Sequence, residues 1–302
     1  MQKISVYFRN PKSAMAGVMR NTCSFMPDKL YLSIMYKLCC NEELHWDNPQ
    51  KFCEKIQWLK LYDRKPEYTT MVDKYAVKDY VASIIGENFI IPTLGVWDRP
   101  EDIDFESLPD SFVLKTTHGG GSLGVVICKD INCFDRKSAI KHLKKSLRQD
   151  IYKQNREWPY KDVPRRIIAE KFIGSVNEPR DLHDYKFYCF GGRPKLLYIT
   201  SNRQGVEGLC EDFFDIEGHF LNIQQRGEKN SPNRPSLPEN LREMRQLAEK
   251  LSQNIPQVRI DFYEVEGKVY FGEMTFYDGS GFYPFQPEEW EYEIGSWIKL
   301  PI

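Results

Sequence analysis

The sequence predicts a protein of the α+β class, and three observations lead to this fold class. Apolar residues recur at helical spacing in the N-terminal region, and the spacing changes to that of strands after residue 85. Farther along the chain, helices and strands are mixed without the regular alternation of βαβ units. With 302 residues, the chain is long enough for about two domains of ordinary size.

Composition places the chain among ordinary globular proteins. Hydrophobic residues make up 41% and charged residues 28% of the sequence. The 42 basic and 43 acidic residues give a net charge of -1, so no overall positive field favours nucleic acid as a partner. The eight cysteines include no C-x-x-C pair, which predicts reduced thiols rather than a zinc site or a disulfide framework.

The chain is expected to be cytoplasmic. No segment approaches the roughly 20 apolar residues that cross a bilayer, and the N-terminus lacks the apolar centre of a secretory signal. Helices predicted at 30–40 and 136–149 are candidates for peripheral contact with a membrane or an acidic polymer, although amphipathic helices more often face a protein core. The sequence makes no prediction of oligomeric state.

Helices are predicted to dominate the first 85 residues. The first has five apolar residues at helical spacing: Leu30, Tyr31, Ile34, Met35 and Leu38. The second has an apolar stripe around Ile56, and Asn48 with Pro49 predicts its start. The third covers 74–85, with Asp73 as its N-terminal cap.

Strands follow, with two further helices between them. Predicted strands cover 111–115, 123–128, 166–173, 184–190 and 195–201. Helices are predicted over 136–149 and 239–253. The last two strands, 257–264 and 268–275, form a hairpin across a turn at 265–267.

A glycine-rich segment, FVLKTTHGGGSLGVVIC at 112–128, joins the first two predicted strands. Its spacing satisfies G-x-G-x-x-G-x-V, but a dinucleotide fold needs a helix after the glycines and a P-loop needs a lysine there. A protein kinase needs a lysine on the following strand with H-R-D and D-F-G motifs, which are missing. Two interpretations remain: a hairpin lid over a nucleotide, with Lys115 near the phosphates, and a glycine turn that binds nothing.

Lys74 lies in the first turn of the helix predicted over 74–85, where the helix dipole disfavours a cation. The position is favourable if Lys74 and the helix N-terminus jointly bind an anion. A solvated lysine without a ligand is the alternative.

Charged residues gather on one face of the predicted hairpin VRIDFYEVEGKVYFGEMT, residues 258–275. A three-residue turn would pair residue 264 with residue 268, so that Arg259 faces Glu273 and Asp261 lies diagonally from it. Two carboxylates at this separation suit a hard cation such as Mg²⁺ held between substrate phosphates. A cross-strand Arg–Glu pair on a solvated face is the alternative.

A fourth segment, IIAEKFIG at 167–174, is an apolar strand that ends in Glu170, Lys171, Phe172 and Ile173. In one interpretation it is a hinge whose backbone groups bind the edge of an adenine while apolar side chains cover the ring. In the other it is a plain core strand.

Taken in order, these four segments resemble the ATP-grasp superfamily, in which two α+β subdomains clasp ATP. DKYAVKDYV is similar to its first phosphate-lysine helix, FVLKTTHGGGSLGVVI to its second lysine and lid, IIAEKFI to its adenine hinge, and RIDFYEVEGKVYFGEMT to its metal hairpin. NPQKFCEKIQWLKLYDR, DYKFY, EMTFYDGSGF and EIGSWIKLP resemble the TupA-like branch in particular. The resemblance implies a helical N-terminal region over 1–71 and an ATP-grasp domain over 72–302, with a lid at 108–172 and a catalytic subdomain at 173–302.

The resemblance also implies roles for the matching residues. Phosphates of ATP would be bound by two lysines and a glycine lid: Lys74, Lys115, Gly119, Gly120, Gly121 and Ser122. The adenine hinge would be formed by Glu170, Lys171, Phe172 and Ile173. Mg²⁺ would be held by Asp261, Glu273 and Thr275, although the usual pattern has asparagine, a stronger ligand, in place of this threonine. Arg259 would stabilise charge on the transferred phosphoryl group, and Lys186 would contact a phosphate or the acyl substrate.

The TupA-like branch is linked to bacterial capsule and exopolysaccharide synthesis. The resemblance therefore implies an ATP-dependent carboxylate–amine ligase that joins an amino acid or another amine to a uronic-acid-type carboxylate through an acyl phosphate. The loop at 278–281 is a candidate donor of N–H groups to the oxyanion of that reaction. A lipid-linked acceptor would place the protein at the inner face of the membrane. The alternatives are a phosphotransferase acting on a sugar hydroxyl, a nucleotide-binding scaffold of capsule assembly, and a glycosyltransferase.

Overall fold

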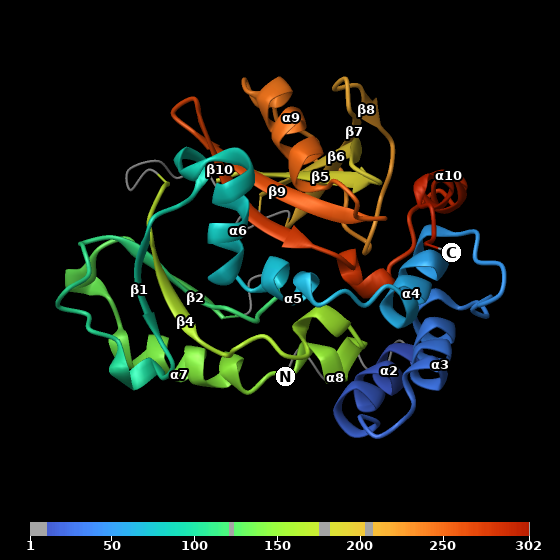
Figure 1. The fold of residues 1–302 in the computed structure, drawn as a ribbon, viewed down its shortest axis with the longest axis horizontal. Coiled ribbons are helices and arrows are strands. Elements are labelled where there is room, and N and C mark those ends of the chain that lie inside the picture. Colours follow the sequence, from blue (N-terminus) through green and yellow to red (C-terminus); the bar gives the residue numbers. More distant parts are fainter. Residues whose placement is uncertain (1–10, 121–123, 175–181, 203–207, 302) are drawn as a thin grey trace.

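The computed structural model describes residues 11–120, 124–174, 182–202 and 208–301, and it confirms the predicted α+β class (Figure 1). Helices cover the start of the chain, and the named strands of the described residues pair antiparallel in two sheets. Figure 1 shows the smaller sheet on one side of the molecule and the helices of residues 11–62 on the other, with the larger sheet above and between them.

The N-terminal helices are α2 (Pro11–Thr22), α3 (Asp28–Cys40), α4 (Phe52–Tyr62), α5 (Glu67–Val72) and α6 (Ala76–Ile85). The predicted start of α4 at Asn48 and Pro49 was wrong. The helix begins later, because the Glu54 carboxylate accepts hydrogen bonds from the backbone N–H groups of Gln50 (2.8 Å) and Lys51 (3.1 Å). A glutamate on the third helical residue that reaches back in this way closes the helix N-terminus as one half of a capping box.

The helix predicted over 74–85 begins two residues later than expected, at Ala76. The Asp73 carboxylate accepts hydrogen bonds from the N–H groups of Tyr75 (2.9 Å) and Ala76 (3.3 Å), so it caps the turn that leads into the helix, whereas Tyr75 stands at the N-cap position of the helix itself. Lys74 therefore lies in the turn before the helix rather than in its first turn.

The smaller sheet has the strand order β1-β4-β2-β3. Its strands are β1 (Thr93–Trp97), β2 (Phe112–Thr116), β3 (Val125–Cys128) and β4 (Ile167–Lys171). Helix α7 (Arg136–Leu147) begins at the Asp135 cap and packs its buried Leu143 against this sheet, and α8 (Ile151–Asn155) follows. The sheet and α7 enclose a hydrophobic cluster of their own around Phe112, Leu114 and Ile167. Short 3₁₀ turns cover Glu87–Phe89, Pro100–Asp102, Ile131–Cys133 and Trp158–Tyr160.

The larger sheet has the strand order β10-β9-β5-β6-β7-β8. Its strands are β5 (Asp184–Phe190), β6 (Arg193–Ser201), β7 (Cys210–Asp215), β8 (Phe220–Leu221), β9 (Val258–Val265) and β10 (Lys268–Thr275). One face is apolar and is covered by α9 (Leu241–Leu251), whose Met244, Leu247 and Leu251 are buried (Figure 1). Strand alternation therefore puts the charged residues of β5 and β9 on the opposite face.

The N-terminal helices share one hydrophobic core with the larger sheet. Phe52 of α4 packs edge-on against Tyr188 of β5 (ring centroids 6.0 Å apart) and against Phe285 (5.2 Å). The short turn η5 (Asp278–Gly281) and α10 (Glu289–Trp297) complete this part of the molecule, with α10 next to α4 (Figure 1). Across the described residues, no helix combines the length and apolar character needed to cross a bilayer.

Candidate functional site

The β9–β10 hairpin carries the predicted metal ligands, but its turn is shorter than predicted. The turn contains two residues, Glu266 (φ 51°) and Gly267 (φ 73°), and Val265 pairs with Lys268. Two consecutive residues with positive φ match the right-handed twist of the strands, which is why two-residue turns of this kind are common in hairpins. The predicted pairing of residue 264 with residue 268 was therefore wrong.

A bulge at Gly272 shifts the register a second time. Glu273 lies opposite Asp261, and Arg259 lies opposite Thr275 instead of Glu273. A Cβ atom on residue 272 would lie 3.1 Å from the carbonyl oxygen of Asp261, so glycine suits this close approach. The shorter turn and the bulge each reverse the alternation of faces, so the two effects cancel. Arg259, Asp261 and Glu273 meet on one face of the sheet, as predicted.

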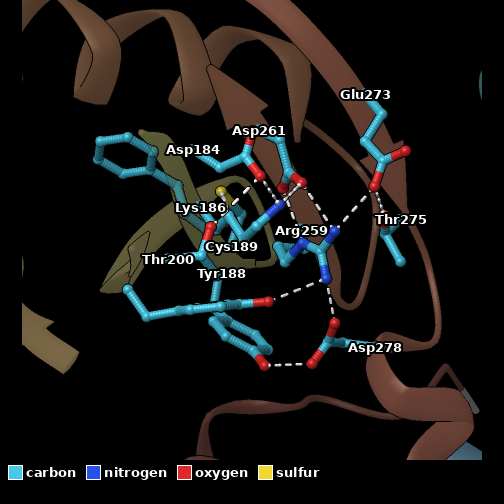
Figure 2. Close-up of polar contacts among 12 residues, drawn as sticks. Asp184, Lys186, Tyr188, Cys189, Thr200, Arg259, Asp261, Glu273, Thr275 and Asp278 are labelled. Atoms are coloured by element: carbon cyan, nitrogen blue, oxygen red, sulfur yellow. Dashed lines mark hydrogen bonds and ion pairs between the residues drawn. The ribbon is translucent and has the colours of Figure 1, made fainter. Parts of the chain in front are cut away.

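Arg259 is the centre of this group of charges (Figure 2). Its Nε and Nη2 donate to the two oxygens of Asp261, both at 2.7 Å, and Nη2 also donates to Glu273 Oε1 at 2.9 Å. Nη1 donates to the carboxylate of Asp278 and to the hydroxyl of Tyr198 (3.1 Å). The guanidinium is thus fixed in orientation by three carboxylates while it is buried.

Two lysines neutralise the same carboxylates from either side. Lys186 of β5 contacts Asp261 and lies 3.3 Å from Asp184. Lys74 Nζ lies 3.0 Å from Glu273 Oε2. Burial opposes the charged form of Glu273, but the charges of Lys74, Arg259 and Lys186 outweigh it and hold its pKa well below the usual range. The carboxylate is therefore ionised at neutral pH.

The side-chain oxygens of Asp261, Glu273 and Thr275 are of the types that bind Mg²⁺. Asp261 and Glu273 face each other, and Thr275 Oγ1 donates to Glu273 Oε1 at 3.2 Å, so the three predicted ligands are adjacent. Within the described part of the chain, no three His, Cys, Asp or Glu side chains are placed to hold a metal together. Two carboxylates and a hydroxyl suit a cation that takes its other ligands from water and substrate phosphates, as Mg²⁺ does.

The smaller sheet carries a second group of charged residues. Lys115 Nζ of β2 and Lys78 Nζ of α6 lie 2.5 Å from opposite oxygens of Glu170 in β4. Burial opposes the charged form of Glu170, but the two lysines outweigh it and lower its pKa. Two ammonium groups on one carboxylate leave an uncompensated positive charge, which suits an anionic ligand. Lys78 was missed by the sequence reasoning, although it lies one helical turn after Lys74.

The glycine lid connects β2 to β3, which pair antiparallel as predicted. Gly119 and Gly120 follow β2, whereas Gly121 and Ser122 lie outside the described residues. Gly124 has φ 83°, and a Cβ atom there would lie 2.2 Å from Ser146 Oγ and 2.3 Å from Thr116 Oγ1. Its N–H donates to His142 Nε2 of α7 at 3.3 Å. The far end of the lid is thus fitted closely against α7.

Lys74 and the lid are joined through the backbone. The N–H group of Lys74 donates to the carbonyl oxygen of Thr117, two residues after Lys115, at 3.1 Å. Arg166, just before β4, lies 2.9 Å from the Asp73 carboxylate. The turn that carries Lys74 is therefore joined to the larger sheet through Glu273 and to the segment after β2 through Thr117.

The predicted adenine hinge begins in β4 and continues beyond it. Glu170 directs its carboxylate at the two lysines, and the Lys171 N–H donates to the Pro92 carbonyl oxygen at 3.0 Å. Phe172 and Ile173 follow the strand and are partly buried. Their contact with adenine stays a prediction.

Asp278 has a role that the sequence reasoning missed. One of its oxygens binds Arg259, and the other accepts hydrogen bonds from Arg226 and from the Tyr188 hydroxyl (2.6 Å). Burial opposes the charged form, but the two arginines outweigh it and lower the pKa of Asp278 to about 2. Arg226 also donates to Glu211 of β7 at 3.0 Å. Arg226 lies in an irregular segment, and the strand β7 that carries Glu211 was not predicted. No periodic signal therefore pointed to Arg226 or to Glu211.

The loop at 278–281 is held from outside by α4. Gln57 Nε2 donates to the carbonyl oxygens of Ser280 (3.1 Å) and Gly281 (2.6 Å), and Lys60 Nζ donates to that of Ser280 at 2.7 Å. Gly279, Ser280 and Gly281 all have φ between 55° and 59°, which is strained for the serine. The Ser280 N–H donates to the Tyr277 carbonyl oxygen at 2.7 Å, so this group is used within the turn. Donation to an oxyanion by the other N–H groups of the loop stays a prediction.

Comparison with known proteins places these features in a family. No curated protein matches the chain. Among solved structures, D-alanine–D-alanine ligase from Helicobacter pylori is 16% identical, with a TM-score of 0.42, over 77% of this chain and 61% of that one. The ATP complex of D-alanine–D-alanine ligase from Bacillus anthracis is also 16% identical, with a TM-score of 0.38, over 68% of this chain and 54% of that one.

A third solved structure is the RimK domain ATP-grasp protein from Sphaerobacter thermophilus. It is 12% identical, with a TM-score of 0.41, over 76% of this chain and 69% of that one. The chain thus spans less than two thirds of the length of either D-alanine–D-alanine ligase.

The sequence model of the TupA-like ATP-grasp family matches residues 54–299. This range includes the lid, the β9–β10 hairpin, the loop at 278–281 and the part of α4 that carries Gln57 and Lys60. It covers well over half of the chain, and it confirms both the predicted family and the ATP-grasp fold. The chain therefore belongs to the TupA-like ATP-grasp family.

Proposed function

We propose that this protein is an ATP-dependent carboxylate–amine ligase that forms an amide through an acyl phosphate. The observation that carries the proposal is the group of charges on the larger sheet. A buried arginine, two carboxylates and two lysines meet on one face, opposite a lid with a further lysine, Lys115. Phosphoryl transfer needs positioning and neutralisation of charge, and this arrangement supplies both.

In this proposal the charged groups exchange partners when ATP binds. In this structure, Lys74 neutralises Glu273 and Lys186 neutralises Asp261. Mg²⁺, held by Asp261, Glu273 and Thr275, would supply charge neutralisation for the phosphates. The lysines released from the carboxylates would then bind phosphate oxygens, together with Lys115 from the lid. Glu170 would keep Lys78 as a partner, so it would not be left buried and unpaired.

Arg259 is the group best placed to stabilise the transferred phosphoryl group and the acyl phosphate. Its guanidinium is already oriented by Asp261, Glu273 and Asp278, so little reorganisation is needed during the reaction. The lid formed by Gly119, Gly120, Gly121 and Ser122 would exclude water, because an acyl phosphate hydrolyses readily. Lys171, Phe172 and Ile173 would bind the adenine.

We further propose that the acid is a uronic-acid-type carboxylate of a polysaccharide and that the amine is an amino acid or another amine. Family membership supports this bacterial capsule or exopolysaccharide setting, since the TupA-like branch is linked to such synthesis. A lipid-linked acceptor would bring the protein into peripheral contact with the inner face of the membrane.

The test is release of ADP and free phosphate from Mg·ATP, with uronic-acid oligosaccharides as acids and a panel of amino acids as amines. Equal amounts of ADP and phosphate, dependent on the amine and accompanied by a product of amide mass, are expected. ADP without free phosphate, together with a phosphorylated sugar, would instead show a phosphotransferase. ATP binding without any turnover across the panel would favour a nucleotide-binding scaffold.

A further inference from the structure

The polar face of the larger sheet continues beyond the proposed ATP site. From β9 it extends across β5 and β6 to β7, where Glu211 pairs with Thr200 and Thr200 pairs with Asp184. Lys74, the lid and β10 lie at one end of this face, whereas Glu211 lies at the other. The proposed nucleotide ligands use none of the groups on β7.

A chain of contacts links Glu211 to the reaction centre. Glu211 Oε1 accepts a hydrogen bond from Arg226 Nη1 at 3.0 Å, and Arg226 Nη2 binds one oxygen of Asp278. The other oxygen of Asp278 binds Arg259. Glu211 is therefore one arginine and one carboxylate away from the guanidinium that faces the transferred phosphoryl group.

Among the residues that the structure describes, the second oxygen of Glu211 has no hydrogen-bond partner. The residue is 1% exposed, and among the described residues no donor forms a hydrogen bond with Oε2. A buried carboxylate oxygen without a partner has lost its hydrogen bonds to water without replacement, so such atoms usually mark a missing ligand or a functional role. What fits this oxygen is a group that donates N–H or O–H bonds.

The surroundings of Glu211 favour proton exchange. Burial raises its pKa to about 7, the Arg226 and Arg259 charges oppose this rise, and Asp278 and Glu228 support it. These are the charged groups that face Glu211 from β9, from η5 and from the segment after β8. Asp278, by contrast, is held ionised by two arginines. Glu211 is thus protonated more easily near neutral pH than Asp278.

We propose that Glu211 binds the amine substrate of the ligase through Oε2 and accepts a proton from its ammonium group. Arg226 holds the carboxylate in place through Oε1. The inference rests on the proposed ligase function and deepens it, because it names a subsite for the amine on the side of Arg259 that faces away from the lid. Arg226, whose side chain is 23% exposed, forms the outer edge of this subsite.

The proton balance of the step is complete. The ammonium group gives one proton to the Glu211 carboxylate, and the free amine attacks the carbonyl carbon of the acyl phosphate. The C–N bond forms as the bond between the acyl carbon and the phosphate oxygen breaks. The second proton lost from nitrogen goes to the leaving phosphate, which departs as hydrogen phosphate. Glu211 then returns its proton to water, and the amide is released.

Glu211→Gln tests the inference, with hydroxylamine as a second amine. Glutamine keeps an oxygen for Arg226 but cannot accept the proton. Hydroxylamine attacks acyl phosphates as a neutral molecule, so it needs no base at pH 7. The acid found by the ligase assay is supplied with Mg·ATP and with either hydroxylamine or the natural-type amine. Glu217→Gln, in the exposed turn after β7, is the matched control for the loss of one charge.

We expect Glu211→Gln to form hydroxamate within about twofold of the unchanged protein and to lose amide formation by about 10²-fold, the usual size of general-base catalysis. Retained hydroxamate also shows that the variant is folded. Equal loss of both products, or unchanged amide formation, would overturn the assignment of Glu211. If the unchanged protein makes neither product from any acid, the ligase proposal itself fails, and this inference falls with it.

Discussion

Glu273 and Glu211 lie at the two ends of the polar face of the larger sheet, and their pKa values are shifted in opposite directions. At the β9–β10 end, Asp261 and Glu273 are surrounded by Arg259, Lys74 and Lys186, and the pKa of Glu273 lies well below its usual range. At the β7 end, Glu211 contacts one arginine, its second oxygen has no hydrogen-bond partner among the described residues, and burial raises its pKa to about 7. Glu273, whose side chain is 27% exposed, keeps its charge beside three cations, whereas Glu211, which is 1% exposed, is protonated more easily.

This difference corresponds to two chemical tasks. Metal and phosphate binding need carboxylates that stay ionised and cations that are preorganised. Proton transfer from an amine needs a group that titrates near the working pH.

Arg259→Met should have the largest effect on the group of charges at the β9–β10 end of the polar face. It removes the shared partner of Asp261, Glu273 and Asp278 and leaves buried carboxylates poorly compensated. We expect a loss of about 3–5 kcal/mol in the free energy of unfolding, measured by urea denaturation, together with loss of ATP turnover. Arg226→Met, which frees two carboxylates, should cost less. A loss below about 1 kcal/mol for Arg259→Met would contradict the central role of this arginine.

Lys115→Ala tests the lid without breaking the sheet. Glu170 keeps Lys78 as a partner, so the free energy of unfolding should change far less than in Arg259→Met. ATP turnover should fall by about 10²–10³-fold, because a preorganised charge at the phosphates is lost. ADP release is the measurement, and Lys129→Ala, an exposed lysine just after β3, is the control. Wild-type turnover in Lys115→Ala would contradict the assigned lid site.

The stability of the protein should depend on pH through Glu211. Its pKa rises from 4.5 to about 7 on folding, so the proton is bound more tightly in the folded state. This contribution is fully present below pH 4.5 and is lost as the pH rises through 7, by up to about 3 kcal/mol. Denaturant unfolding between pH 5 and 8 should therefore show a decline that is reduced in Glu211→Gln. Parallel curves for the two proteins would contradict the raised pKa.

Thr275→Asn should slightly strengthen Mg²⁺ binding at the β9–β10 end of the polar face. An amide carbonyl is a better Mg²⁺ ligand than a hydroxyl, and asparagine stands at this position in the usual ATP-grasp pattern. We expect the Mg²⁺ concentration for half-maximal turnover to fall about fivefold, or roughly 1 kcal/mol of binding free energy. Thr275→Val, which removes the hydroxyl, should raise it. Identical Mg²⁺ dependence in all three proteins would remove Thr275 from the metal site.

Periodic signals were sufficient for the fold class and for most of the elements that carry the site. Alternation along β9 and β10 correctly placed Arg259, Asp261 and Glu273 on one face. The register was wrong because a turn length and a bulge are set by single residues, Gly267 and Gly272, rather than by any period.

Other parts of the site left no periodic trace in the sequence. Arg226 and Asp278 lie in irregular segments, and their contact with Arg259 depends on long-range packing. The pairing of Lys115 with Glu170 follows from the neighbouring positions of β2 and β4, which a single sequence does not specify. Contacts of this kind become visible only once the strand order is known.

The clasp between α4 and the loop at 278–281 has a consequence for how the protein is made. Gln57 and Gly281 are 224 residues apart in the chain, yet they share a hydrogen bond beneath the reaction centre. On the ribosome, the lid with its own core can form early, since its strands lie within residues 93–171. The α4 helix must wait for the last strands and the closing loop to emerge. A nascent chain that stops before residue 278 would therefore carry a finished lid and an Arg259 without its Asp278 support.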